Sequence, residues 1–337
     1  MSASRTQMFP SLASATEAGG MRSVPRARQL RLSVTDRCNF RCRYCMPAMG
    51  VAKLTHEEIL PLEALAGLVE WLSVHAGIRR VRLTGGEPLV RQGVCGLIAK
   101  IRAFPAIEEI TVTTNGTLLP RMAKDLKAAG VSRVNISLDS LDRQRFAQIS
   151  RGGDLALTLA GIEAAREAGL TPIKLNAVLL RSTWREEVPA LLDFAAGNDF
   201  ELRFIELMRM GTERDWCESE YISANEARSG LNVEIEAVNE PGNSPAQRTV
   251  MNWRGKKVTV GWITPRSHPF CSSCDRLRLD ARGQLRRCLM DPATLDLPRA
   301  VGAWDATSAR REFDEYFSQK RPPLMMDSSL AMSQIGG

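Results

Sequence analysis

Along most of the chain, short apolar runs rich in β-branched residues alternate with longer segments of helical periodicity. The strand-like runs are Leu30–Val34, Arg80–Leu83, Glu109–Thr113, Arg133–Leu138, Ile173–Leu179 and Leu202–Glu206. The helix-like segments between them are Leu62–His75, Val94–Phe104, Leu119–Ala129, Leu155–Ala168 and Glu186–Ala196. This alternation predicts an α/β fold of parallel strands joined by right-handed helical crossovers.

The number of these units and the glycines at their helix ends limit the possible folds. Six units fall short of the eight that close a TIM barrel. A doubly wound sheet would give a similar pattern. Gly77, Gly130, Gly169 and Gly197 fall at or just past the predicted helix ends, where a left-handed C-cap favours glycine.

The pattern breaks past residue 210. Residues 239–245 form a dense cluster of turn-forming residues, and the runs Arg248–Trp253 and Lys257–Ile263 predict a hairpin across Gly255. We therefore expect a partial barrel over residues 28–224 and a smaller α+β domain over residues 225–337. Residues 1–27 are rich in Ser, Ala, Gly and Arg without periodicity, which predicts a disordered tail.

Composition restricts the class of protein. Of 337 residues, 44% are hydrophobic and 25% charged, as in soluble globular proteins, and no apolar run approaches the ~20 residues of a spanning helix. The formal net charge of +7 favours an anionic partner without distinguishing a nucleotide from a nucleic acid. Eight cysteines without a secretory signal indicate a reducing compartment and metal ligation, and three histidines make a histidine-built metal site improbable.

A first set of cysteines follows the first predicted strand. Cys38, Cys42 and Cys45 have C-x3-C-x2-C spacing. Thiolates are soft ligands that suit zinc, copper(I) or iron–sulfur clusters. Structural zinc takes four protein ligands, so three thiolates imply either a remote fourth ligand or a cluster with one open iron.

Polar and glycine-containing motifs follow the other strands. The carboxyl ends of parallel strands meet on one rim, where βα folds place active sites. Motifs at this rim are Thr84–Pro88 (with Gly85-Gly86-Glu87), Thr113–Gly116, Ser137–Asp139, Lys174 with Asn176, and Glu206–Met208.

A second set of three cysteines lies in the predicted C-terminal domain. Cys271, Cys274 and Cys288 again lack a nearby fourth ligand, which suggests a second open-iron cluster. Arg276 and Arg278 would share one face of an extended segment, and guanidinium groups suit phosphate oxygens. The chain ends in Gly336-Gly337, a tail without side chains that would fit a narrow cavity.

The first cysteine motif resembles the signature of radical S-adenosylmethionine (SAM) enzymes. Together with the Gly-Gly-Glu-Pro motif, the second cysteine set, the Arg-x-Arg and the Gly-Gly terminus, it resembles the GTP 3′,8-cyclases (molybdenum cofactor biosynthesis protein A) over about residues 29–337. The resemblance implies an incomplete (βα)6 TIM-like barrel closed by the C-terminal domain. It implies a lyase that converts GTP to (8S)-3′,8-cyclo-7,8-dihydroguanosine 5′-triphosphate, the first step of molybdenum cofactor (molybdopterin) biosynthesis.

The resemblance also implies cofactors and site residues. One 4Fe-4S cluster would be held by Cys38, Cys42 and Cys45, and a second by Cys271, Cys274 and Cys288. SAM would be contacted by Tyr44, Gly86, Ser137 and Met208. GTP would be held by Arg31, Arg82, Thr113, Lys174, Arg276 and Arg278. Catalytic roles would fall to Arg276, Arg278, Gly336 and Gly337.

The implied partners are GTP, a flavodoxin- or ferredoxin-like reductant, and a downstream cyclic pyranopterin monophosphate synthase. A cytoplasmic location without nucleic-acid or membrane partners is expected, and a homodimer is compatible with the resemblance. Two alternatives remain at this point. One is a radical SAM enzyme that modifies a peptide with an auxiliary cluster, and the other is a basic zinc protein that binds nucleic acid.

Overall fold

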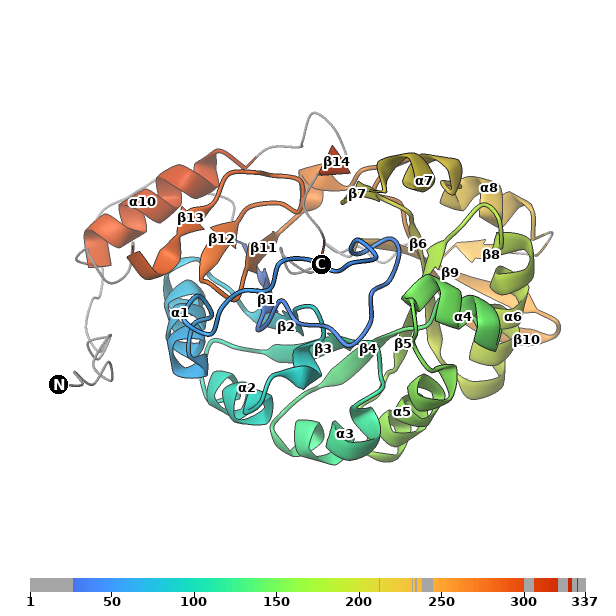
Figure 1. Cartoon of the computed structure of the whole chain (residues 1–337), viewed down its shortest axis with the longest axis horizontal. Helices are drawn as coiled ribbons and strands as arrows, with labels where there is room; N and C mark the ends of the chain where they lie inside the picture. The colour runs from blue at the N-terminus through green and yellow to red at the C-terminus, as the bar shows by residue number, and fades with distance from the viewer. Residues whose placement is uncertain are drawn as a thin grey trace.

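The computed structural model describes residues 27–211, 213–231, 233, 235–237, 245–299, 306–320, 327–328 and 332. A curved sheet forms its centre, and helices cover the outer side of the curve (Figure 1). The parallel strands are β1 (Gln29–Ser33), β2 (Arg80–Thr84), β3 (Glu109–Thr114), β4 (Arg133–Ser137), β5 (Lys174–Leu179) and β6 (Glu201–Glu206). The intervening helices are α1 (Leu62–His75), α2 (Val94–Arg102), α3 (Leu119–Ala128), α4 (Arg143–Ser150), α5 (Leu155–Glu167) and α6 (Trp184–Asn198).

Strands β1 to β6 lie side by side in chain order, and every neighbouring pair is parallel. This arrangement confirms the six predicted βα units and the incomplete barrel. A doubly wound sheet would instead reverse its strand order partway across.

The two faces of the strands separate apolar from polar side chains. In β1, Leu30 and Leu32 are fully buried, while Arg31 between them points to the opposite face. Strand β2 repeats the pattern, with Val81 and Leu83 buried on either side of Arg82. The apolar face packs in one core with the helices, and the arginines face the inner side of the sheet. The alternation therefore places apolar side chains in the core and arginines on the inner side of the sheet.

Strands from the C-terminal part of the chain extend this sheet at both edges. Strand β11 (Arg276–Leu279) pairs in parallel with β1, and β10 (Lys256–Ile263) pairs in parallel with β6. The remaining strands of the sheet are β8 (Ile235–Ala237), β9 (Ala246–Trp253), β12 (Gln284–Arg286) and β13 (Leu295–Asp296). The result is one sheet of twelve strands among the described residues. The domain boundary near residue 225 stays a prediction.

Smaller elements complete the description. They are η1 (Pro88–Val90), β7 (Arg209–Met210), α7 (Arg214–Ser219), α8 (Ala224–Ser229), η2 (Cys271–Ser273), α10 (Ala306–Ser318) and β14 (Asp327–Ser328). Strand β14 pairs in parallel with β7. No helix in the described ranges is long and apolar enough to cross a membrane.

Most predicted elements are confirmed, with shifts of one or two residues at their ends. The β9–β10 hairpin turns at Gly255, whose φ is +82°. Gly77, Gly130 and Gly169 have positive φ after their helices, but the prediction for Gly197 was wrong. Helix α6 continues through Asn198, and Asp199 adopts the left-handed conformation instead. Helix α4 was not anticipated, because its eight residues bury only Phe146 and Ser150.

The predicted N-terminal tail is not tested by the structure. Residues 1–26 lie outside the described residues. Ala27, the last residue of the predicted tail, is described and buried.

Candidate active site

The inner side of the sheet encloses a cavity of about 320 Å³. All six clustered cysteines line it, although the two sets come from distant parts of the chain. It is also lined by most of the other predicted site residues, namely Arg31, Tyr44, Arg82, Gly86, Thr113, Ser137, Met208, Arg276 and Arg278. The fold thus brings the strand-end motifs and the C-terminal motifs to one place.

The first cysteine loop is held against the Gly-Gly turn after β2. The Gly86 amide donates to the Thr35 carbonyl at 2.8 Å, and the Glu87 amide donates to the Arg37 carbonyl at 2.8 Å. A Cβ on Gly86 would lie 2.3 Å from the Arg37 carbonyl oxygen, closer than any real Cβ contact. Glycine is therefore required here because the two loops approach at the backbone.

Glu87 is a site residue that the sequence analysis did not single out. Its side chain is 1% exposed and accepts hydrogen bonds from the Thr114 hydroxyl at 2.8 Å and the Asn115 amide at 2.8 Å. The Asn115 side chain in turn donates to Asn39, inside the first cysteine loop, at 2.7 Å. Burial raises the pKa of Glu87 to about 7. Glu87 thus connects the ends of β2 and β3 with the cysteine loop.

A second buried carboxyl lies beside Tyr44. The Tyr44 hydroxyl donates to Asp139 Oδ2 at 2.7 Å, and the Val178 amide donates to Asp139 Oδ1 at 2.9 Å. Burial raises the pKa of Asp139 to about 6. Asp139 follows Ser137 at the end of β4, so this contact fixes the orientation of Tyr44 next to Cys45.

Two cations contact the second cysteine set. Arg276 Nε lies 3.4 Å from Cys274 Sγ, and Lys320 Nζ lies 3.6 Å from the same sulfur. Lys320 also donates to the Arg276 carbonyl at 2.6 Å, which fixes its position after α10. The charges of Arg276 and Lys320 lower the pKa of the Cys274 thiol despite its burial. A thiolate is therefore favoured at Cys274.

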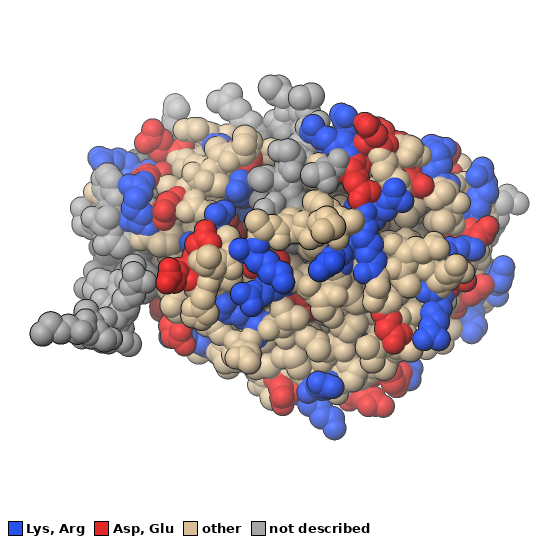
Figure 2. All heavy atoms as spheres, in the orientation of Figure 1, with Lys and Arg blue, Asp and Glu red and all other residues tan. Residues whose placement is uncertain are grey.

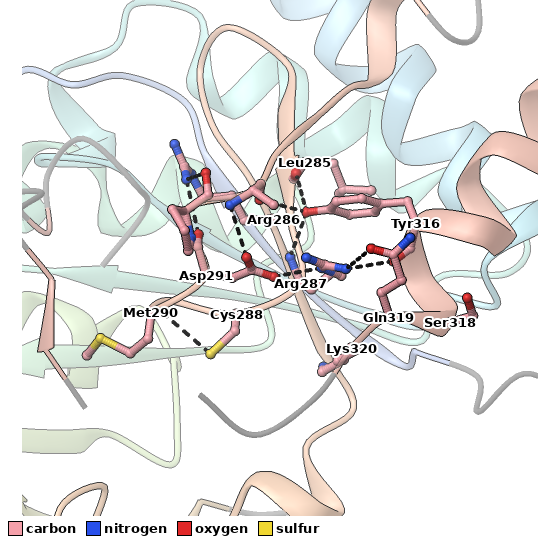
Figure 3. A network of polar contacts seen from close by, with 12 residues as sticks. Leu285, Arg286, Arg287, Cys288, Met290, Asp291, Tyr316, Ser318, Gln319 and Lys320 are labelled. Atoms are coloured by element: carbon pink, nitrogen blue, oxygen red, sulfur yellow. Dashed lines mark hydrogen bonds and ion pairs between the residues drawn. The ribbon is translucent and has the colours of Figure 1, made fainter. Parts of the chain in front are cut away.

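Arg287 fixes the loop that carries Cys288 to the end of α10 (Figure 3). Its guanidinium donates to Asp291 at 2.7 Å, to the Tyr316 carbonyl at 3.1 Å and to Gln319 at 3.2 Å. The Tyr316 carbonyl lies in the last turn of α10, where backbone acceptors lack helical partners. Helix α10 therefore contacts both parts of the second cysteine set, through Lys320 on one side and Arg287 on the other.

Three arginines form a row across neighbouring strands, with Arg278 buried and Arg31 and Arg82 half-buried. Arg278 on β11 lies opposite Arg31 on β1, and Arg31 lies opposite Arg82 on β2. Desolvation and the neighbouring positive charges lower the pKa of Arg31 and Arg82, and burial lowers the pKa of Arg278 to about 9. Such a row favours an anionic ligand, because an anion would offset both the desolvation and the mutual repulsion.

Lys174, whose predicted role in holding GTP stays a prediction, pairs with a carboxylate on the neighbouring strand. It does not line the cavity, and its Nζ lies 2.7 Å from Glu201 Oε2. Arg203, which the sequence analysis overlooked, does line the cavity and contacts the same carboxylate at 2.7 Å. Arg203 neighbours Asn176 in the β5–β6 pairing, a relation that only the sheet register reveals.

All eight cysteines are free of disulfides. In the described part of the chain, no three His, Cys, Asp or Glu side chains lie close enough together to hold one metal ion.

The C-terminal Gly336 and Gly337 lie outside the described residues, so their predicted role stays a prediction. Met332, five positions before the end, is described and lines the cavity. Its amide donates to the Cys45 carbonyl at 3.1 Å, and its side chain packs against the cluster of Met210 and Met290, against which Cys288 also packs. The chain near its C-terminus therefore contacts loops of both cysteine sets.

Comparison with known families divides the chain into two matched regions. Residues 32–195 match the radical SAM superfamily, and residues 200–325 match the family described as Molybdenum Cofactor Synthesis C.

Curated relatives extend over nearly the whole chain. A GTP 3′,8-cyclase of Pelotomaculum thermopropionicum is 45% identical over 317 residues, which are 91% of this chain and 97% of that protein. A GTP 3′,8-cyclase of Moorella thermoacetica is 43% identical over 319 residues with the same coverage. A GTP 3′,8-cyclase of Pseudomonas putida is 43% identical over 288 residues, covering 84% of this chain and 85% of that protein.

Solved structures of Streptococcus suis SuiB share the fold. The SuiB structure bound to precursor peptide SuiA has a TM-score of 0.62 at 14% identity, covering 89% of this chain and 66% of that chain. The structure bound to S-adenosylmethionine has a TM-score of 0.61 at 13% identity, covering 82% of this chain and 64% of that chain. At such low identities this likeness concerns the fold alone.

Proposed function

This chain belongs to the GTP 3′,8-cyclase family of radical SAM enzymes, and we propose that its central cavity binds S-adenosylmethionine and GTP side by side. It is a lyase of molybdenum cofactor biosynthesis that converts GTP to (8S)-3′,8-cyclo-7,8-dihydroguanosine 5′-triphosphate. The observation that carries the proposal for the site is the pair of cysteine sets lining one cavity, with the arginine row beside them.

The side of the cavity near β1 to β4 suits SAM. Membership of the family implies one 4Fe-4S cluster together with SAM, and we assign that cluster to Cys38, Cys42 and Cys45. When bound, this group supplies the radical chemistry that the cyclisation requires. Gly86 lets its backbone approach the amino-acid end of SAM, while Tyr44, Ser137 and Met208 supply the remaining contacts.

The opposite side of the cavity suits GTP. Arg31, Arg82 and Arg278 form a row of positive charge on the inner side of the sheet, and its neutralisation would favour binding of the triphosphate. We assign Arg276 and Thr113 to the same ligand, since both line the cavity. Lys174 contributes to GTP binding indirectly, because Lys174 and Arg203 both contact the Glu201 carboxylate.

The second cysteine set is proposed to hold a second 4Fe-4S cluster next to the nucleotide. Cys271, Cys274 and Cys288 line the cavity near Arg276, and three thiolates would leave one iron open for a ligand. Gly336 and Gly337 are proposed to enter the same space, as the contact of Met332 with Cys45 suggests. The residues around the cavity would then position both substrates and exclude water.

The family reaction also implies partners. An electron must be supplied to the enzyme, and we propose a flavodoxin- or ferredoxin-like reductant. We propose that the cyclised nucleotide passes to a cyclic pyranopterin monophosphate synthase. Eight disulfide-free cysteines favour a reducing, cytoplasmic location.

The proposal is tested with anaerobically reconstituted enzyme, dithionite, SAM and GTP. We expect a nucleotide product with the mass of GTP and formation of 5′-deoxyadenosine that depends on GTP. Cys42→Ala should abolish both, whereas Cys95→Ala, a cysteine on α2 away from the cavity, should retain them. Equal amounts of 5′-deoxyadenosine with and without GTP, and no new nucleotide, would refute GTP as the substrate.

A further inference from the structure

The loop that carries the first cysteine set displays positive charge to solvent. Between residues 37 and 56 it contains Arg37, Arg41, Arg43 and Lys53 and no acidic residue. All four basic residues are exposed. Figure 2 shows Lys and Arg side chains near the middle of this face, where the loop after β1 runs in Figure 1.

Most of this charge is not balanced locally. Arg43 lies 2.8 Å from Glu213, which also contacts Arg151, so one carboxylate serves two arginines. Arg37, Arg41 and Lys53 make no ion pair with any described residue. The loop therefore presents uncompensated positive charge directly beside Cys38 and Cys42.

The same loop also presents an apolar residue. Asp36 closes the loop at its base by accepting the Leu54 amide at 2.7 Å. A tight turn follows Pro47, with the Gly50 amide donating to the Pro47 carbonyl at 2.8 Å and Gly50 at φ +81°. This turn leaves Met49 93% exposed. Arg41 Nε lies 3.9 Å from the position of a Cβ on Gly50, so the cation and the turn that carries Met49 are neighbours.

We propose that the loop spanning residues 37–54 is the docking surface for a small, acidic one-electron carrier protein. Protein interfaces have an apolar centre bordered by polar residues, and an exposed apolar residue surrounded by positive charges matches this arrangement. Complementary charge would steer an acidic partner to this surface and speed association. The inference rests on the proposed function, because only a cluster held by Cys38, Cys42 and Cys45 gives the docked carrier an electron acceptor.

The transfer itself is simple. A cluster held by Cys38, Cys42 and Cys45 would accept one electron from the reduced carrier, and no bond would be made or broken. Cys38 and Cys42 are direct sequence neighbours of exposed Arg37 and Arg41, so a carrier seated here lies one residue from the cluster ligands.

The test reverses the charge of exposed side chains and keeps the hydrogen bonds that hold the loop in place. Arg41→Glu/Lys53→Glu reverses two exposed charges and keeps the backbone hydrogen bonds of the loop, such as that from the Arg41 amide to the Ser150 carbonyl. The matched control is Arg121→Glu/Lys124→Glu, which reverses two exposed charges on α3. Each protein is assayed with dithionite and separately with a reduced acidic flavodoxin, and cluster reduction is followed by stopped-flow absorbance.

We expect the flavodoxin-driven reduction rate to fall by about tenfold or more in the loop variant and to change little in the α3 variant. Activity with dithionite should persist in both, and the wild-type flavodoxin rate should fall as salt rises. An unchanged flavodoxin rate in the loop variant, or an equal loss in both variants, would overturn the docking surface. Loss of product with dithionite in the wild type would instead count against the proposed function.

Discussion

Arg31 on the first strand and Arg278 on a strand of the C-terminal region lie directly opposite each other in the parallel β1–β11 pairing. Arg82 continues the row on β2. Desolvation, and after it the neighbouring charges of Arg278 and Arg276, lower the pKa of Arg31, so placing these like charges side by side opposes folding. An anionic ligand would neutralise this row, so the electrostatics of the site favour the ligand-bound protein over the ligand-free protein.

The first prediction concerns this row. Arg31→Met should weaken GTP binding by about ten- to a hundredfold, since a hydrogen bond to a charged group contributes roughly 1.5–3 kcal/mol. The same change should leave the thermal stability of the ligand-free protein equal or higher, because it removes a repulsive buried charge. Calorimetric titration with GTP and a thermal melt measure the two effects. Unchanged GTP affinity in a cluster-replete variant would remove Arg31 from the site.

A second prediction compares two glycines. Gly86→Ala should disrupt the first cysteine loop, because the added Cβ would meet the Arg37 carbonyl at 2.3 Å. Iron content and SAM affinity should both fall. Gly96→Ala is the matched control, since Gly96 is exposed in α2 with nothing within 4 Å of its Cβ position. It should stabilise the protein by about 0.5–1 kcal/mol. Normal SAM binding by the Gly86 variant would contradict the close approach.

A third prediction follows from the buried Glu87 carboxyl. Its pKa rises from 4.5 to about 7 on folding, so between these values the folded protein retains a proton that the unfolded chain releases. Its contribution to stability must therefore decline as pH rises from about 4.5 to 7. The thermal midpoint of wild-type apoprotein should fall relative to that of Glu87→Gln over this range. A constant difference between the two midpoints would show that Glu87 ionises normally.

A fourth prediction concerns Lys320 and the proposed second cluster. Its ammonium group lies 3.6 Å from Cys274 Sγ, and hydrogen bonds to ligand sulfurs favour the reduced cluster. Lys320→Met should lower the reduction potential of that cluster by on the order of tens of millivolts. Lys124→Met, an exposed lysine on α3, should not. Potentiometric titration followed by electron paramagnetic resonance distinguishes the two, and equal potentials would exclude Lys320 as a tuning residue.

The sequence was most informative where local pattern determines structure. The alternation of Leu30, Arg31 and Leu32 predicts the strand, and in the structure it also separates core from cavity. The cysteine spacings and the Gly-Gly-Glu-Pro turn identify the loops that meet at the cavity. These features depend on residues close together in the chain.

What could not be predicted depends on contacts between distant segments. No local signal indicates that β11 completes the edge at β1, or that β10 completes the edge at β6. For the same reason the sequence analysis missed Arg203 and Lys320. The position of Arg203 depends on the β5–β6 register, and that of Lys320 depends on the end of helix α10. Lys174 was correctly placed on β5, but its partner Glu201 emerges only when β5 and β6 align.

The two C-terminal strands that flank the barrel also constrain how the protein is made. Until β10 and β11 have been synthesised, β1 and β6 are open sheet edges with unpaired backbone groups, which invite pairing with other chains. A ribosome-bound or prematurely stopped chain ending before residue 256 would lack both strands and Arg278, one of the three arginines of the row. Truncation before these strands should therefore give aggregates rather than a partly active fragment.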